Sequence, residues 1–289
     1  MKKVVSVMVF LLAVYGCLYS QAGEQVYIVG SDGDDAVYWL NGRRNVLPKT
    51  GSRAGASAIA VSGSNVYIAG SDRSDYSNSN AVYWLNGRRN VLPKTGDSAH
   101  ASAIAVSGSN IYIAGQDGDD AVYWLNGQRN VLPKTGSRAS ASAIAVSGSN
   151  VYIAGWNGYN AVYWLNGRRN VLPKTGSSAW AYAIAVSGSN VYIAGENGDD
   201  AVYWLNGRRN VLPKTGSRAS ARAIAVSGSN VYIIGEDVSG MRMFFAEGDL
   251  YPATAAYWLN GQINEINALP TAGPLSAARA NAIMVTLTP

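Results

Sequence analysis

The sequence predicts an all-β fold, a six-bladed β-propeller with four antiparallel strands in each blade. Three observations predict it. One segment recurs at near-constant spacing, four short strand-like runs lie within each repeat, and each type of run occurs six times along the chain. A repeat of about 40 residues with four strands per unit is typical of a propeller blade.

The recurring segment is AVYWLNG, with a looser final copy, AAYWLNG, at Ala255. Successive copies are 45, 40, 40, 40 and 54 residues apart. Their first residues are Ala36, Ala81, Ala121, Ala161, Ala201 and Ala255.

The four runs are clearest between Ser140 and Pro173, where they read AIAVS, NVYIAG, AVYWL and RNVLP. Ser-Gly-Ser-Asn separates the first two, and Asn-Gly, a strong two-residue hairpin signal, separates the last two. Because side chains alternate along a strand, Tyr163 and Trp164 are expected on opposite faces. Both faces are then apolar, which suits a blade packed between two others.

The order of the runs predicts how the ring closes. The first type of run begins at Ala58, Ala103, Ala143, Ala183 and Ala223, and returns at Asn281 near the end of the chain. The chain itself enters at a second-type run, residues 26–29. We therefore expect the strand from Asn281 to Leu287 to pair into the first blade, leaving no bare sheet edge at the seam.

Residues 1–22 have the pattern of an export signal, and residues 23–289 form the expected propeller. Lys2 and Lys3 precede an apolar run from Val4 to Tyr15, which is too short to span a bilayer. The only cysteine, Cys17, follows in the sequence LAVYGC, which resembles a lipoprotein lipobox. We expect a lipid-anchored protein of the cell envelope. The alternative is cleavage after Ala22, giving a periplasmic or secreted protein.

The repeated VYIAG and YWLNG segments resemble the VYVAG and YWxNG repeats of uncharacterised bacterial exported propellers. The resemblance covers essentially the whole chain after the signal. It implies the fold and export, and no activity.

Aromatic residues outside the repeat mark a candidate ligand site. Six of the eight tryptophans belong to the recurring segment. The other two are expected on top-face loops, Trp156 in the fourth blade and Trp180, together with Tyr182, in the connection after it. Exposed aromatic and amide side chains suit stacking on a sugar or anchoring a protein, although these aromatics could instead pack on each other. The expected ligand residues here are Trp156, Asn157, Tyr159, Asn160, Trp180 and Tyr182.

An extension in the sixth blade adds Phe244 and Phe245 to this candidate site. The last spacing is 14 residues longer than the usual 40, and the insert contains the only phenylalanines after the signal. Methionines beside aromatics suit a lid or an interaction loop. A plug folded into the ring is the alternative.

Charged residues are distributed by loop. Most carboxylates lie between the second and third runs, as in SDGDD, where calcium binding is possible although no calcium-loop spacing occurs. The turns between the third and fourth runs carry paired arginines, expected as a membrane-facing basic rim or as solvated edge residues. These are Arg43, Arg44, Arg88, Arg89, Arg168, Arg169, Arg208 and Arg209.

The expected function is a non-catalytic binding module with a carbohydrate or protein ligand. His100 is the only histidine, no cofactor motif or nucleotide fingerprint occurs, and no nucleic-acid partner is expected. A monomer is expected. The alternatives are a structural or assembly scaffold of the envelope and a carboxylate-based glycan-processing enzyme.

Overall fold

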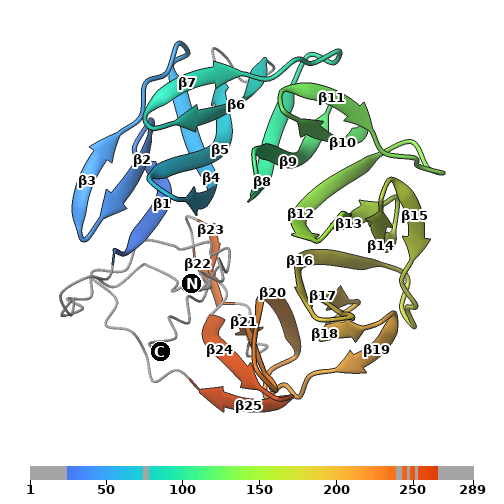
Figure 1. Ribbon diagram of the computed structural model, residues 1–289. Coiled ribbons are helices and arrows are strands. Elements are labelled where there is room, and N and C mark those ends of the chain that lie inside the picture. Colours follow the sequence, from blue (N-terminus) through green and yellow to red (C-terminus); the bar gives the residue numbers. More distant parts are fainter. Residues whose placement is uncertain (1–24, 74–77, 239–242, 246–247, 251–252, 266–289) are drawn as a thin grey trace.

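The computed structural model describes residues 25–73, 78–238, 243–245, 248–250, 253–265 of the 289-residue chain. The described residues form β-strands and turns, with no helix. Figure 1 shows six sheets arranged around a common axis in the manner of a β-propeller.

The first five sheets are each built from consecutive strands. The first contains β1 (Tyr27–Asp32), β2 (Asp35–Leu40) and β3 (Arg43–Val46). The second contains β4 (Arg53–Ser62), β5 (Asn65–Arg73), β6 (Ser79–Leu85) and β7 (Arg88–Val91). The third contains β8 (Ala99–Ser107), β9 (Asn110–Asp117), β10 (Asp120–Leu125) and β11 (Gln128–Val131).

The remaining sheets follow the same plan. The fourth contains β12 (Ala139–Ser147), β13 (Asn150–Asn157), β14 (Asn160–Leu165) and β15 (Arg168–Val171). The fifth contains β16 (Ala179–Ser187), β17 (Asn190–Asn197), β18 (Asp200–Leu205) and β19 (Arg208–Val211). The sixth contains β20 (Arg218–Ser227), β21 (Asn230–Val238), β24 (Ala253–Leu259) and β25 (Gln262–Glu265), and the hairpin β22 (Met243–Phe245) and β23 (Gly248–Leu250) is inserted between β21 and β24.

Every sheet is an antiparallel meander, as predicted from the runs. The first sheet has three strands, and its neighbours have four. The strand expected to complete it, Asn281 to Leu287, lies outside the described residues, as do the signal and Cys17.

Glycine and asparagine at the turns allow the tight hairpins. Asn166 and Gly167, between β14 and β15, have φ values of 50° and 80°, and the same pair recurs in all six sheets. Positive φ at both central residues defines the type I′ turn that Asn-Gly favours. In the turn between β13 and β14 the glycine, Gly158, is the first central residue, so the preceding Asn157 is the last residue of a strand.

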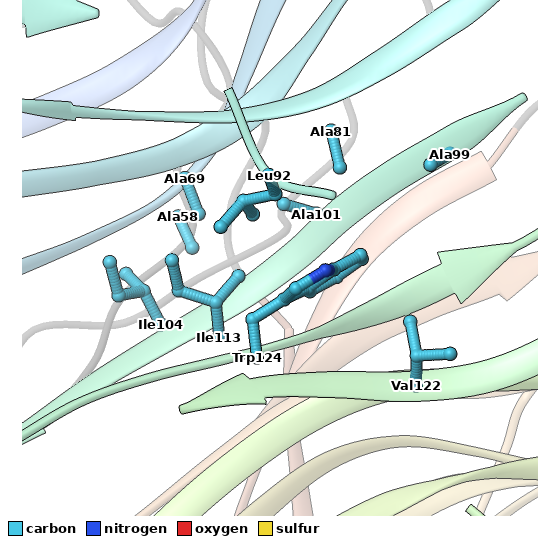
Figure 2. Packing of buried hydrophobic residues seen from close by; sticks show 10 residues of the cluster. All are labelled: Ala58, Ala69, Ala81, Leu92, Ala99, Ala101, Ile104, Ile113, Val122 and Trp124. Atoms are coloured by element: carbon cyan, nitrogen blue, oxygen red, sulfur yellow. The ribbon is translucent and has the colours of Figure 1, made fainter. Parts of the chain in front are cut away.

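The core lies between neighbouring sheets. Figure 2 shows Trp124 of the third sheet packed with Leu92 and Ala58 of the second. The equivalent Trp164 is fully buried, and its indole N–H donates to the Pro133 carbonyl oxygen of the preceding sheet at 2.9 Å. Tyr163 packs instead against the cluster shared with the fifth sheet, which confirms the predicted opposite faces.

A bulge in the first strand of each four-stranded sheet explains the glycine in the IAG segment. In the fifth sheet the register shifts between Ala181 and Ala183, so Tyr182 is the extra residue. A Cβ on Gly195 would collide with the carbonyl oxygen of Trp180. Only glycine fits this close backbone approach.

Candidate functional site

Differences between the repeats locate the site. Residues 97–136, 137–176 and 177–216 form three aligned 40-residue units, identical except at ten positions. In the numbers of the first unit these are Asp97, Ser98, His100, Ser102, Ile111, Gln116, Asp117, Asp119, Asp120 and Gln128.

Eight of these ten positions, all except Ile111 and Gln128, lie at one end of the sheet. Ala99 pairs with Asp117, and His100 pairs with Gln116, so the start of the first strand and the turn between the second and third strands are adjacent. We call this part of each sheet the variable end. Since loops and strand ends over a rigid scaffold commonly carry function, it is the candidate binding surface.

The predicted aromatics are at the variable end, but partly on strands. Trp156 is half-buried on β13, and Tyr159 is 73% exposed in the turn after it. Trp180 and Tyr182 lie on β16, so the prediction that placed these residues and Trp156 on loops is wrong. The bulge at Tyr182 allows the pairing to continue from Ala183 back to Ala179, so the strand begins at Ala179. Asn160 opens β14 and is half-buried.

Asn157 has a structural role rather than the predicted exposure. It is 2% exposed, and its Oδ1 accepts hydrogen bonds from the Thr135 backbone N–H and hydroxyl, at 2.8 and 3.1 Å. Thr135 belongs to the connection that enters the fourth sheet. Asn157 therefore holds this connection in place and offers little to a ligand.

Aspartates at the equivalent position of other sheets accept the same hydrogen bonds from the connection that enters their sheet. Asp117 accepts hydrogen bonds from Thr95 N–H, the Thr95 hydroxyl and Gly96 N–H, at 2.8, 3.0 and 2.9 Å. Asp237 does so with Thr215 and Gly216. Burial acts to raise the pKa of the Asp117 carboxyl, but these hydrogen bonds and the charge of Arg129 together lower it below its ordinary value. Among the described residues no group of three or more acidic, histidine or cysteine side chains is placed to hold a metal ion.

The paired arginines separate into two sets. The first arginine of each pair is exposed, as in Arg43, Arg88, Arg168 and Arg208. The second runs along its sheet toward the opposite end. Arg89 forms an ion pair with Asp72 at 2.5 Å, and Arg44 pairs with Asp32 at 2.6 Å. Arg89 is therefore half-buried in its ion pair, whereas Arg44 stays exposed although it pairs with Asp32, and its predicted place in the basic rim stays a prediction.

Two second-set arginines lack that carboxylate. Arg169 and Arg209 belong to the sheets in which Asn157 and Asn197 replace the aspartate. Arg209 has a fully buried Nη1 without a hydrogen-bond partner among the described residues.

A polar cluster not singled out by the sequence lies between the fifth and sixth sheets. The Arg222 guanidinium stacks over the Tyr182 ring at 4.4 Å, and Arg218 donates to Glu196 at 3.2 Å. Glu196 is 2% exposed. Burial first, and then the nearby Glu196 carboxylate, raises the pKa of Tyr182 well above its usual range. The bulge residue is Ser142 in the fourth sheet, Tyr182 in the fifth and Arg222 in the sixth. Comparing these equivalent positions in the sequence would have pointed to the cluster.

His100 occupies the same strand position as Trp180. Its Nε2 lies 3.2 Å from the hydroxyl oxygen of the buried Ser79. Burial, followed by the charges of Arg73, Arg138 and Lys94, lowers the pKa of His100.

Phe244 and Phe245 lie on β22, which pairs with β23. Their side chains are outside the described part of the structure, so their predicted ligand role stays a prediction. Among the described residues no helix is long and apolar enough to cross a membrane.

No protein-family model and no curated protein matches this chain. Among solved structures, the chain is similar to the computationally designed Ika8 protein, at 15% identity and a TM-score of 0.47, over 85% of this chain and 84% of that one. It is also similar to YjhT, at 12% identity and a TM-score of 0.41, over 73% and 82% of the two chains.

Proposed function

We propose that the chain is an exported, non-catalytic binding module that presents its variable end to a carbohydrate or protein ligand. One observation carries the proposal: eight of the ten differences between three otherwise identical units gather at that end. Drift without function would scatter differences over exposed positions elsewhere. The exposed valines Val131, Val171 and Val211 at the outer strands instead stay the same in every unit.

The proposal includes a closed, six-bladed ring. The three-stranded first sheet would gain its fourth, innermost strand from Asn281 to Leu287. Closure removes the exposed edges through which strands aggregate, so the ring would be a rigid monomer.

The proposed location is the cell envelope, with a lipid on Cys17. Since the chain enters the fold at β1 from the end opposite the variable end, the exposed Arg43, Arg88, Arg168 and Arg208 would face the membrane. Basic residues near anionic lipid each contribute on the order of 1 kcal/mol. The variable end would then face away from the membrane.

Two other functions compete with this one. An envelope scaffold would use the outer strands, which differ among the three aligned units only at Gln128. A glycan-processing enzyme would need a free carboxylate pair. Asp72, Asp117 and Asp237 are instead engaged in hydrogen bonds of the scaffold.

The test is binding of the chain from Gly23 onward to a glycan array and to envelope proteins, repeated with repeat-matched variants. Trp156→Gln, Trp180→Ser and Tyr182→Ser install the residues that Gln116, Ser140 and Ser142 already place at the same positions. The proposal expects a ligand, with binding weakened tenfold or more by the triple variant. Equal binding by the variant would refute the site.

A further inference from the structure

Acidic and basic side chains form a network at the variable end, and this network is complete in the third sheet. Arg129 pairs with Asp117 at 2.6 Å and reaches Asp120 at 3.6 Å. Lys134 pairs with Asp120 at 2.8 Å, and Arg138 approaches Asp119 at 3.7 Å. Three carboxylates thus neutralise three cations. The first sheet repeats the arrangement with Asp32, Asp34, Asp35 and Arg44, Lys49, Arg53.

The fourth sheet replaces all three carboxylates at once. Asn157, Tyr159 and Asn160 stand where the third sheet has Asp117, Asp119 and Asp120. Of the three corresponding cations, Arg169 and Lys174 remain, and Ser178 stands in place of Arg138. The fifth sheet loses only one carboxylate, at Asn197, and its Lys214 still pairs with Asp200 at 2.9 Å.

The scaffold still holds Lys174 in the position of its counterparts. Its Nζ donates to the carbonyl oxygens of Tyr159 and Ser177 at 3.0 and 2.7 Å. Lys134 makes the equivalent bonds to Asp119 and Ser137 at 3.0 and 2.8 Å. The ammonium group is therefore placed to meet a carboxylate, although no described residue supplies one.

The residue whose backbone carbonyl oxygen binds Lys174 also carries an exposed aromatic side chain. Tyr159 is 73% exposed, far more than any tryptophan of the repeat, and its own carbonyl oxygen binds Lys174. An aromatic face suits the apolar face of a sugar ring, and an ammonium or guanidinium group suits a carboxylate. The Asn160 amide can add hydrogen bonds to hydroxyl groups.

We propose that this corner of the fourth sheet, formed by Tyr159, Asn160, Arg169 and Lys174, binds a carboxylate-bearing saccharide. The saccharide carboxylate takes the place of the missing aspartates, and Tyr159 stacks on the ring. This inference rests on the proposed function and names the ligand class for one sector of its site. Because the cations are only partly buried, binding weakens as salt rises.

The test uses three defined probes: tetragalacturonate, a hyaluronate tetrasaccharide and 3′-sialyllactose. Calorimetry is carried out with the chain from Gly23 onward. At least one probe is expected to bind with one site per chain, and its methyl-esterified form to bind at least tenfold more weakly. Octaglutamate, which offers carboxylates without sugar rings, is expected not to compete.

Repeat-matched variants sharpen the test. N157D/Y159D/N160D turns the loop into the Asp-Gly-Asp-Asp sequence that already folds at 117–120, and is expected to abolish binding without lowering the unfolding temperature. The reciprocal graft, D117N/D119Y/D120N, is expected to raise the stoichiometry from one site to two. The matched control N197D restores a carboxylate in the fifth sheet and is expected to leave binding unchanged.

Each outcome decides between the claims. Failure of all three acidic probes, or equal binding of the methyl esters, overturns this inference. If the chain then binds neutral glycans or a protein through Trp156, Trp180 and Tyr182, the proposed function stands without it. Competition by octaglutamate would assign the corner to an acidic peptide and overturn the saccharide.

Discussion

Asp117 shows how one residue type can serve the scaffold where the sequence suggests a ligand site. The repeated Asp-Gly reads locally as a hairpin signal or a calcium loop. Its partners, Thr95 and Gly96, lie 22 and 21 residues earlier, in the connection that enters the third sheet. A contact over that separation leaves no local pattern, so the sequence could not reveal it.

Asn197→Asp is expected to stabilise the protein. The new carboxylate would accept a hydrogen bond from the half-buried Arg209 guanidinium, as Asp117 does from the Arg129 Nε at 2.6 Å, although Arg129 keeps one buried nitrogen, Nη2, without a partner. Satisfying a buried charged donor contributes about 1–3 kcal/mol, part of which desolvation of the new carboxylate offsets. Thermal unfolding checks it, with Asp117→Asn as the reciprocal control expected to lower the midpoint. A lower midpoint for Asn197→Asp would contradict this account of the ion pair.

His100 is expected to make stability fall in mild acid. Its pKa in the folded protein is below the ordinary value of 6.5, so the unfolded chain binds the proton more tightly. Its contribution is therefore fully present above about pH 6.5 and is lost as pH falls through the folded pKa. Urea unfolding at pH 7.5 and pH 5 measures the difference.

His100→Ser, which matches Ser140 of the next unit, serves as the control for this pH dependence. The variant should lose less stability than the parent between the two pH values. An identical loss would mean that other groups carry the pH dependence.

At the scale of strands and turns, the sequence was most informative where the signal is local. The Asn-Gly turns, the order of strands and the buried Trp164 were all predicted, since they depend on turn chemistry and alternation. The bulge at Tyr182 was not predicted, because one extra residue breaks the alternation on which strand prediction relies. That is why Trp180 and Tyr182 were assigned to a loop.

Gly195→Ala is expected to disrupt the bulge in the fifth sheet. The added Cβ would collide with the Trp180 carbonyl oxygen and lie 3.0 Å from the Trp204 ring. Backbone cannot yield as a flexible side chain can, so a loss of about 1–3 kcal/mol is expected. Gly167→Ala is a useful comparison, since its Cβ meets nothing within 4 Å and only its positive φ of 80° is strained. A smaller loss at Gly195 than at Gly167 would contradict the role of the bulge.

For the molecule as a whole, the proposed closure predicts the effect of removing the last strand. A chain ending at Pro274 would leave the first sheet with three strands and an open inner edge. We expect this chain to aggregate and to unfold at a lower temperature. Light scattering and calorimetry check this, and an equally heat-resistant monomer would refute closure by residues 281–287.

The central claim is that scaffold and binding surface are separate sets of residues within one repeat. The most direct measurement compares the free energy of unfolding of two variants by urea titration. Trp164→Ala removes a fully buried ring and its bond to Pro133, and should cost about 3–5 kcal/mol. The triple variant Trp156→Gln, Trp180→Ser and Tyr182→Ser should cost less than half of that, because neighbouring units fold with those residues. A loss as large as that of Trp164→Ala would make the aromatics part of the core and contradict the account.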